Sequence, residues 1–162
     1  FTQNLEVIEI KFAWLVYMIG GLVGGRQTYF STEEDDVIDG EIACKVINIM
    51  NENKSWSDPR GSANGSEKLE LAFIYFFQQF RKSYIGESSQ NVSKAYNKLS
   101  EQLGINDQTM LLEIIVTKIG TNLKIWGANT NIINRTVALF NDLAAGYSSV
   151  RFLRKIQTAQ FI

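Results

Sequence analysis

Apolar residues recur at three- and four-residue intervals through nearly the whole chain, which is the spacing that places them on one face of an α-helix. The alternating runs that are typical of strands are missing. The single proline, Pro59, lies in the most polar segment, residues 51–66, which is rich in Asn, Ser and Gly. The sequence therefore predicts an all-α chain with one long loop over residues 52–65.

Capping residues divide this pattern into six helices and the start of a seventh. Ser31 with Glu34 is a candidate capping box, and Ser66 and Asn106 are candidate N-caps. Glycines follow three of the predicted helices at the position that a C-cap favours. The predicted helices cover residues 3–24, 32–50, 66–86, 92–104, 106–127, 130–146 and 148 onward, and the terminating glycines are Gly86, Gly104 and Gly127.

Each predicted helix has an expected core-facing row. The first helix is apolar nearly all round, which indicates a helix buried between neighbours. The others carry narrower rows. These rows are Ile38, Ile42, Val46 and Ile49; Leu69, Phe73, Phe76, Phe80 and Tyr84; Val92, Tyr96, Leu99 and Leu103; Leu112, Ile115, Ile119 and Trp126; and Ile133, Val137, Phe140 and Leu143.

The third, fifth and seventh helices begin about 40 residues apart, which is the period of two-helix HEAT or armadillo units. We therefore expect a HEAT/armadillo-like α-solenoid, a right-handed stack of antiparallel helix pairs. Its approximate units are 1–51, 66–104, 106–146 and the start of another at 148–162. Such a pair cannot bury its apolar face alone, so we expect residues 1–162 to be an internal segment of a longer protein, with uncovered ends.

Composition argues against several kinds of chemistry. The chain has no histidine and one cysteine, Cys44, which excludes His-based catalysis, His–Cys metal sites and an internal disulfide within this segment. We expect Cys44 to be a core thiol. The net charge is −1, so no basic surface for nucleic acid is expected. The sequence predicts a protein that is not an enzyme and holds no cofactor or metal.

The glycine cluster of residues 20–25 resembles a phosphate-binding loop only in composition. It follows a helical pattern, and it lacks both the Lys-Ser/Thr pair and the G-x-G-x-x-G order. We interpret it as close helix packing followed by helix termination. The run from Phe12 to Val23 is apolar for about a dozen residues, whereas a membrane span needs about 20, so no membrane insertion is expected.

Two features are candidate partner contacts. Glu33, Glu34, Asp35 and Asp36 fall in a first helical turn, where acidic residues suit the helix dipole and where they can also meet a basic partner. Trp56 lies in the polar loop, where it either folds back or anchors a partner. Trp14 and Trp126 lie on apolar rows and are expected in the core.

Several longer runs resemble one family, the Ran-binding nuclear transport receptors of the exportin-7 group within the importin-β superfamily. The resemblance spans essentially the whole chain and departs at residues 51–66. The runs that carry it are Ile10–Tyr17, Asp39–Glu41, Glu67–Ala72, Phe80–Lys82, Tyr84–Gly86, Thr121–Lys124, Trp126–Gly127 and Gly146–Arg151.

The resemblance implies a receptor that binds Ran-GTP and cargo proteins. It also implies that this receptor contacts nuclear pore proteins and shuttles through the pore between nucleus and cytoplasm, with export as its direction. Members of this family contact Ran largely through amino-terminal repeats, so no Ran-contact residue is assigned in residues 1–162. Two alternatives stay open. One is a HEAT-repeat scaffold unrelated to transport. The other is an enzyme that uses only Asp, Glu or Lys, although no convergent carboxylate pair is visible.

Overall fold

The computed structural model describes residues 2–26, 32–55, 66–85 and 94–146. These ranges form six helices and contain no strand, which confirms the all-α prediction. The helices are α1 (Thr2–Gly25), α2 (Glu33–Ser55), α3 (Glu67–Tyr84), α4 (Lys94–Leu103), α5 (Gln108–Ile125) and α6 (Thr130–Ala145).

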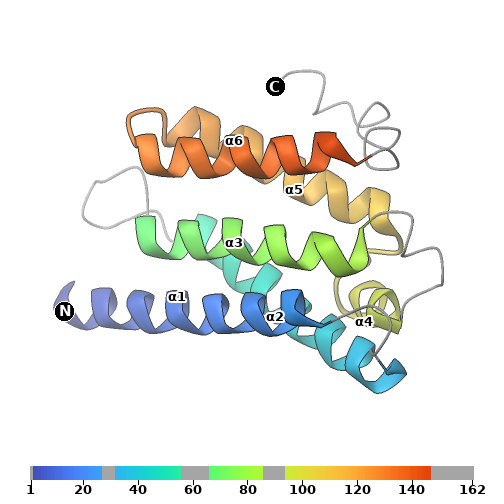
Figure 1. Ribbon diagram of the computed structural model, residues 1–162. Helices are drawn as coiled ribbons and strands as arrows, with labels where there is room; N and C mark the ends of the chain where they lie inside the picture. Colours follow the sequence, from blue (N-terminus) through green and yellow to red (C-terminus); the bar gives the residue numbers. More distant parts are fainter. Residues whose placement is uncertain (1, 27–31, 56–65, 86–93, 147–162) are drawn as a thin grey trace.

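The helices form two layers, as expected for an α-solenoid (Figure 1). In the layer nearest the viewer, α3 lies between α1 and α6 and contacts both. In the layer behind, α4 stacks on α2, and α5 lies behind α6 and contacts it. A simple alternation of layers would place α5 beside α3. Here α6 takes that position, and α5 follows α4 in the rear layer.

The core is centred on α3. All five residues of its predicted row, from Leu69 to Tyr84, are buried, and the rings of the last three contact one another along the helix. The centroid of Phe76 lies 5.5 Å from that of Phe80, which lies 4.6 Å from that of Tyr84. Aromatic pairs at these separations add to the stability gained by burying their area. The predicted row of α5 is buried as well, including Trp126.

The predicted rows of α2 and α6 are confirmed only in part, because Val46 and Leu143 are buried but one residue of each row is exposed. Ile38 is 46% exposed and Val137 is 42% exposed, whereas the next residue in α2, Asp39, and the preceding residue in α6, Thr136, are fully buried. Both buried residues are polar and have partners inside the protein. A hydropathy pattern places such residues outside, because it does not account for a hydrogen bond that offsets their burial.

The facing helix decides which side of α2 is buried. A Cβ atom on Gly40 would lie 2.6 Å from the backbone oxygen of Ala95 in α4, so only glycine permits this approach. Cys44 is also fully buried on this side, as predicted, and burial raises the pKa of its thiol. The close contact with α4 therefore rotates the core face of α2 toward Asp39, Gly40 and Cys44.

Helix ends agree with the predictions to within a few residues, except in α2. That helix continues to Ser55, so residues 51–55 are helical and not part of the predicted loop. Nothing in Asn51–Ser55 breaks a helix, since the proline comes only at residue 59. The predicted terminator Gly104 is confirmed, with φ of 69°. Ser31, Gly86, Val92 and residues 147–162 lie outside the described ranges.

Two predicted N-caps are displaced by one residue. Asp107, not Asn106, caps α5, and its side chain accepts hydrogen bonds from the backbone N–H groups of Thr109 and Met110. At α2, the reciprocal capping pair joins Thr32 and Asp35 instead of Ser31 and Glu34. In each case two neighbouring residues are both of a type that caps helices, and the sequence alone does not show which of them is the cap.

Candidate partner-binding surfaces

The acidic turn at the start of α2 divides into two halves. Glu33 and Glu34 point to solvent, and the Glu33 side chain is 83% exposed. Its only described partner is Lys94 of α4, 3.9 Å away. Asp35 and Asp36 are partly buried and contact other elements of the same chain. Any partner contact through this turn therefore falls first on the two glutamates.

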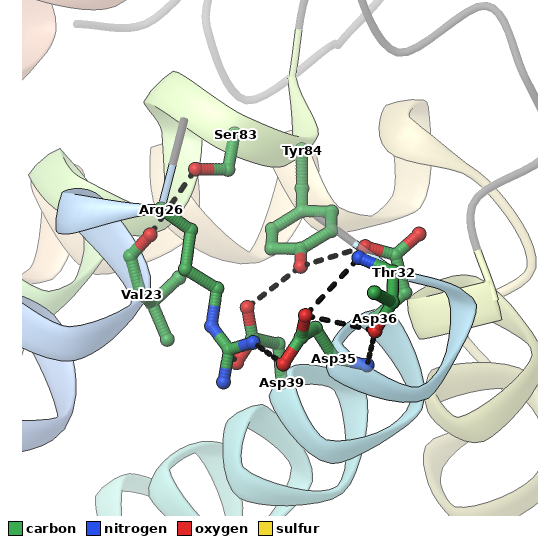
Figure 2. A network of polar contacts seen from close by, with 8 residues as sticks. All are labelled: Val23, Arg26, Thr32, Asp35, Asp36, Asp39, Ser83 and Tyr84. Atoms are coloured by element: carbon green, nitrogen blue, oxygen red, sulfur yellow. Dashed lines mark hydrogen bonds and ion pairs between the residues drawn. The ribbon is translucent and has the colours of Figure 1, made fainter. Parts of the chain in front are cut away.

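Asp35 links the end of α1 to the start of α2 (Figure 2). Its carboxylate accepts hydrogen bonds from the backbone N–H of Thr32 at 3.1 Å and from the Thr32 hydroxyl at 2.8 Å. It also forms an ion pair with Arg26, the residue that follows α1. The hydrogen bonds from Thr32 and the Arg26 charge lower the pKa of Asp35. The carboxylate is therefore held in its charged form by the joint between two helices.

Asp39 and Tyr84 extend this network into the core (Figure 2). The Tyr84 hydroxyl donates to Asp39 Oδ2 at 2.7 Å and also lies 3.2 Å from Asp36 Oδ1. Arg26 Nε lies 3.2 Å from Asp39 Oδ1, although this contact lacks hydrogen-bond geometry. Burial raises the pKa of Asp39, and it also raises that of Tyr84, which stays protonated as a donor.

This network is a structural joint of α1, α2 and α3. Ser83 adds a further contact, donating from its hydroxyl to the backbone oxygen of Val23 at 3.3 Å (Figure 2). The sequence prediction missed Arg26, Asp39 and Tyr84 as network members. A usable signal was present, because a tyrosine in a buried row needs a partner for its hydroxyl. An acidic residue such as Asp39 within the core face of a facing helix supplies one.

A second missed interaction joins α3 to α5. Lys118 Nζ lies 2.5 Å from Glu70 Oε2, and both side chains are almost fully buried. The ammonium group also lies 5.9 Å from the centre of the Phe73 ring. A charge is tolerated at such depth only when it is paired. This pair therefore fixes the contact between the two layers and is not a binding site.

The outer face of α1 carries six of the ten large apolar side chains that are exposed in the described residues. Trp14, predicted to be core, is 66% exposed, and Met18 is 64% exposed. The prediction that α1 is buried between neighbours is wrong for this face, because helices cover only its other side. The exposed apolar residues are Val7, Ile8, Trp14, Leu15, Met18 and Leu22. Exposed apolar surface of this kind marks an interaction site.

The glycines of α1 allow α3 to approach closely. A Cβ atom on Gly20 would lie 3.0 Å from the Tyr75 ring, and one on Gly24 would lie 2.4 Å from the Gln79 side chain. This confirms that the cluster serves helix packing. Glu6–Gly25 is nevertheless long and apolar enough to cross a membrane by length and composition. The apolar stretch is therefore longer than the predicted dozen residues, and a core helix of a soluble protein meets the same criterion.

Two shallow grooves lie on opposite layers. The front groove, of about 330 Å³, is lined by α1, α3 and α6 and has one charged residue, Arg135. The rear groove, of about 350 Å³, is formed by α2, the end of α4, α5 and the segment between α4 and α5, and its one charged residue is Glu113. Their lining residues are Tyr17, Leu71, Ile74, Tyr75, Gln78, Asn131 and Arg135 in front, and Asn51, Leu103, Ile105, Met110, Glu113, Ile114 and Thr117 behind.

The remaining candidates add no site. Within the described ranges, no group of three His, Cys, Asp or Glu residues is arranged to hold a metal ion. Trp56 lies outside those ranges, so its predicted role as a partner anchor stays a prediction. Neither of these two grooves holds convergent catalytic groups.

The comparisons with known proteins all point to one family. The family model described as "Exportin-7-like, TPR domain" matches residues 1–162. The chain is 48% identical over 161 residues to Exportin-7-B of Xenopus laevis and 44% identical over 161 residues to Ran-binding protein 17 of Homo sapiens. Against Exportin-7 of Dictyostelium discoideum it is 42% identical over 159 residues.

These alignments cover most of the chain and a small part of each relative. They include 99% of the chain but 14% of the Xenopus and human proteins, and 93% of the chain but 15% of the Dictyostelium protein. No solved structure gives a significant match.

Proposed function

Since the chain belongs to the exportin-7-like family, we propose that it is part of a nuclear transport receptor that binds Ran-GTP and protein cargo. The observation that carries this proposal is the match of the family over residues 1–162, together with relatives named as exportins and Ran-binding proteins. The receptor contacts nuclear pore proteins and moves between nucleus and cytoplasm, with export as its direction.

The physical character of the chain supports a receptor role over catalysis. The described helices offer shallow grooves and an exposed apolar face, which suit protein partners. The net charge of −1 favours neither nucleic acid nor an anionic membrane surface. We propose that the protein uses no cofactor and inserts in no membrane.

The mechanism that we propose is conformational. In a solenoid, each repeat contacts only its neighbours, so small rotations between repeats add up to a change in curvature. The Arg26–Asp35–Asp39–Tyr84 joint limits rotation between α1, α2 and α3. Partners that bind distant repeats are then coupled through the curvature that each of them prefers.

We further propose that the exposed face of α1 packs against another repeat of the longer protein. The relatives are several times longer than this chain, because it covers about 14% of their length. Repeat proteins bury such faces by stacking. The acidic residues Glu33 and Glu34 then form the exposed rim of this junction, where a basic partner segment has access.

A pull-down of the full-length protein with Ran loaded with GTP or GDP tests the proposed function. A transport receptor retains Ran-GTP and not Ran-GDP. A HEAT-repeat scaffold unrelated to transport retains neither form, and that result would refute the proposal.

A further inference from the structure

The front groove differs from its surroundings by combining aromatic rings with one positive charge. The Trp14 ring centroid lies 6.4 Å from that of Tyr17, which lies 5.2 Å from that of Tyr75. Tyr17 and Tyr75 line the groove, whereas Trp14 lies beside it on the exposed face of α1. Tryptophan, tyrosine and arginine are the residue types most enriched at the energetic centres of protein interfaces.

Arg135 of α6 supplies the charge on the opposite side of the groove. It forms no ion pair with any carboxylate in the described part of the chain. It lies near enough to Tyr17 for its charge to lower the pKa of that hydroxyl, against the larger raising effect of burial. The guanidinium and the aromatic wall therefore face the same narrow space.

The charges around the groove differ between its two ends. None of its lining residues is acidic. The nearest carboxylate along α6 that the contacts place beside α3 is Asp142, which accepts a hydrogen bond from Gln78 at 3.3 Å. It lies seven positions after Arg135 in the same helix, a rise of about 10 Å. An incoming carboxylate is therefore attracted at the Arg135 end and repelled at the Asp142 end.

We propose that the front groove binds a segment of a partner protein in which a large apolar side chain lies within about three residues of a carboxylate. The volume of about 330 Å³ is at the lower limit for ligand sites and suits a side chain or two. The apolar group packs on Tyr17, Leu71 and Tyr75, and the carboxylate pairs with Arg135. The rear groove, whose one charge is Glu113, excludes such a segment.

This inference deepens the proposed function, because it assigns partner chemistry to one surface of the receptor. The test is a random 12-residue peptide library displayed on phage and selected in parallel on full-length wild-type protein, the Arg135→Glu variant and the Lys45→Glu variant. Lys45 is an exposed cation of α2 in the rear layer, so its reversal is the matched control.

Peptides that carry an aromatic or large aliphatic residue near Asp or Glu should be enriched on the wild type and on Lys45→Glu. Their binding should fall about tenfold to a hundredfold on Arg135→Glu, because a hydrogen-bonded ion pair is lost and repulsion replaces it. Peptides with Lys or Arg in place of the acid should gain on that variant. Equal selection on wild type and Arg135→Glu, or no enrichment on any protein, would overturn the proposal.

Two controls separate this result from folding and from the proposed function. Arg135→Gln removes the charge without adding repulsion, and it should show the same loss to a smaller extent with an unchanged circular dichroism spectrum. All variants should retain Ran-GTP as the wild type does. If the wild type fails to bind Ran-GTP, the transport proposal fails while the peptide selection still decides the groove.

Discussion

Helices α1 and α3 are both rich in apolar residues, yet the structure uses them differently. α3 lies between α1 and α6, and Phe73, Phe76 and Phe77 are fully buried. α1 contacts helices on one side only, and Trp14, Met18 and Leu22 are more than half exposed. Burial in this protein is therefore set by the number of neighbouring helices, as the repeat architecture requires, and not by the hydropathy of the helix itself.

Truncating a large side chain in α3 and one in α1 should show the largest difference in stability between the two helices. Phe76→Ala in α3 should lower the free energy of unfolding by about 3–5 kcal/mol, because it leaves a cavity among buried rings. Trp14→Ala in α1 should change it by no more than about 0.5 kcal/mol. Urea denaturation of the 162-residue chain, followed by circular dichroism, measures both. Equal losses would mean that α1 is as covered as α3.

The buried ion pair between Glu70 of α3 and Lys118 of α5 should contribute more to stability than an ion pair at the surface. Lys118→Met should cost about 3–5 kcal/mol, since it leaves Glu70 charged and buried without its partner. The double variant Glu70→Leu, Lys118→Met should recover most of that loss. The exposed Lys98–Glu101 pair, treated in the same way, should show a coupling below about 1 kcal/mol. A double-mutant cycle in urea gives both couplings.

The contact between α1 and α3 can be tested by substituting glycines of α1. Gly20→Ala should destabilise by about 1–3 kcal/mol, because the added Cβ meets the Tyr75 ring at 3.0 Å and the Phe76 backbone at 3.3 Å. Gly21→Ala meets only the Tyr75 hydroxyl at 3.9 Å, so its higher helix propensity should stabilise by up to about 1 kcal/mol. The opposite signs should appear in thermal unfolding, and a stabilising Gly20→Ala would refute the close approach.

The smallest expected effect is the pH dependence of stability that comes from Asp39, in the joint of α1, α2 and α3. Burial raises the pKa of Asp39, so the folded state binds a proton more tightly than the unfolded state at this residue. Its contribution to stability is therefore largest at low pH and declines as pH rises through the raised pKa. Asp39→Asn should remove this decline. Urea midpoints between about pH 4 and 7 measure it, and identical profiles for both proteins would contradict the assignment.

The sequence predicted the helices because their apolar rows and caps are local features. The rows of α3 and α5, where aromatic and aliphatic residues are dense, were correct in every described position. The rows of α2 and α6 each had one exposed residue, Ile38 and Val137, because the neighbouring Asp39 and Thr136 are buried through hydrogen bonds to other helices. Such contacts join residues 45 and 14 positions apart, which no helical period encodes.

The candidate surfaces were less predictable than the fold. The acidic turn was visible in the sequence, but its division into exposed Glu33 and paired Asp35 depends on where Arg26 lies. The front groove was not predicted at all, since its walls come from three helices that meet only in the folded stack. Trp14 was assigned to the core by its apolar neighbours, and that assignment failed because none of the six described helices covers this face.

The exposure of α1 gives the most direct test of an account in which neighbouring repeats decide burial. Met18→Cys places a thiol on the uncovered face, and its alkylation rate can be followed by mass spectrometry in the 162-residue chain and in the full-length protein. The account predicts rapid alkylation in the isolated chain and a rate at least about tenfold lower in the full-length protein, where another repeat covers α1. Equally rapid alkylation in both would contradict it.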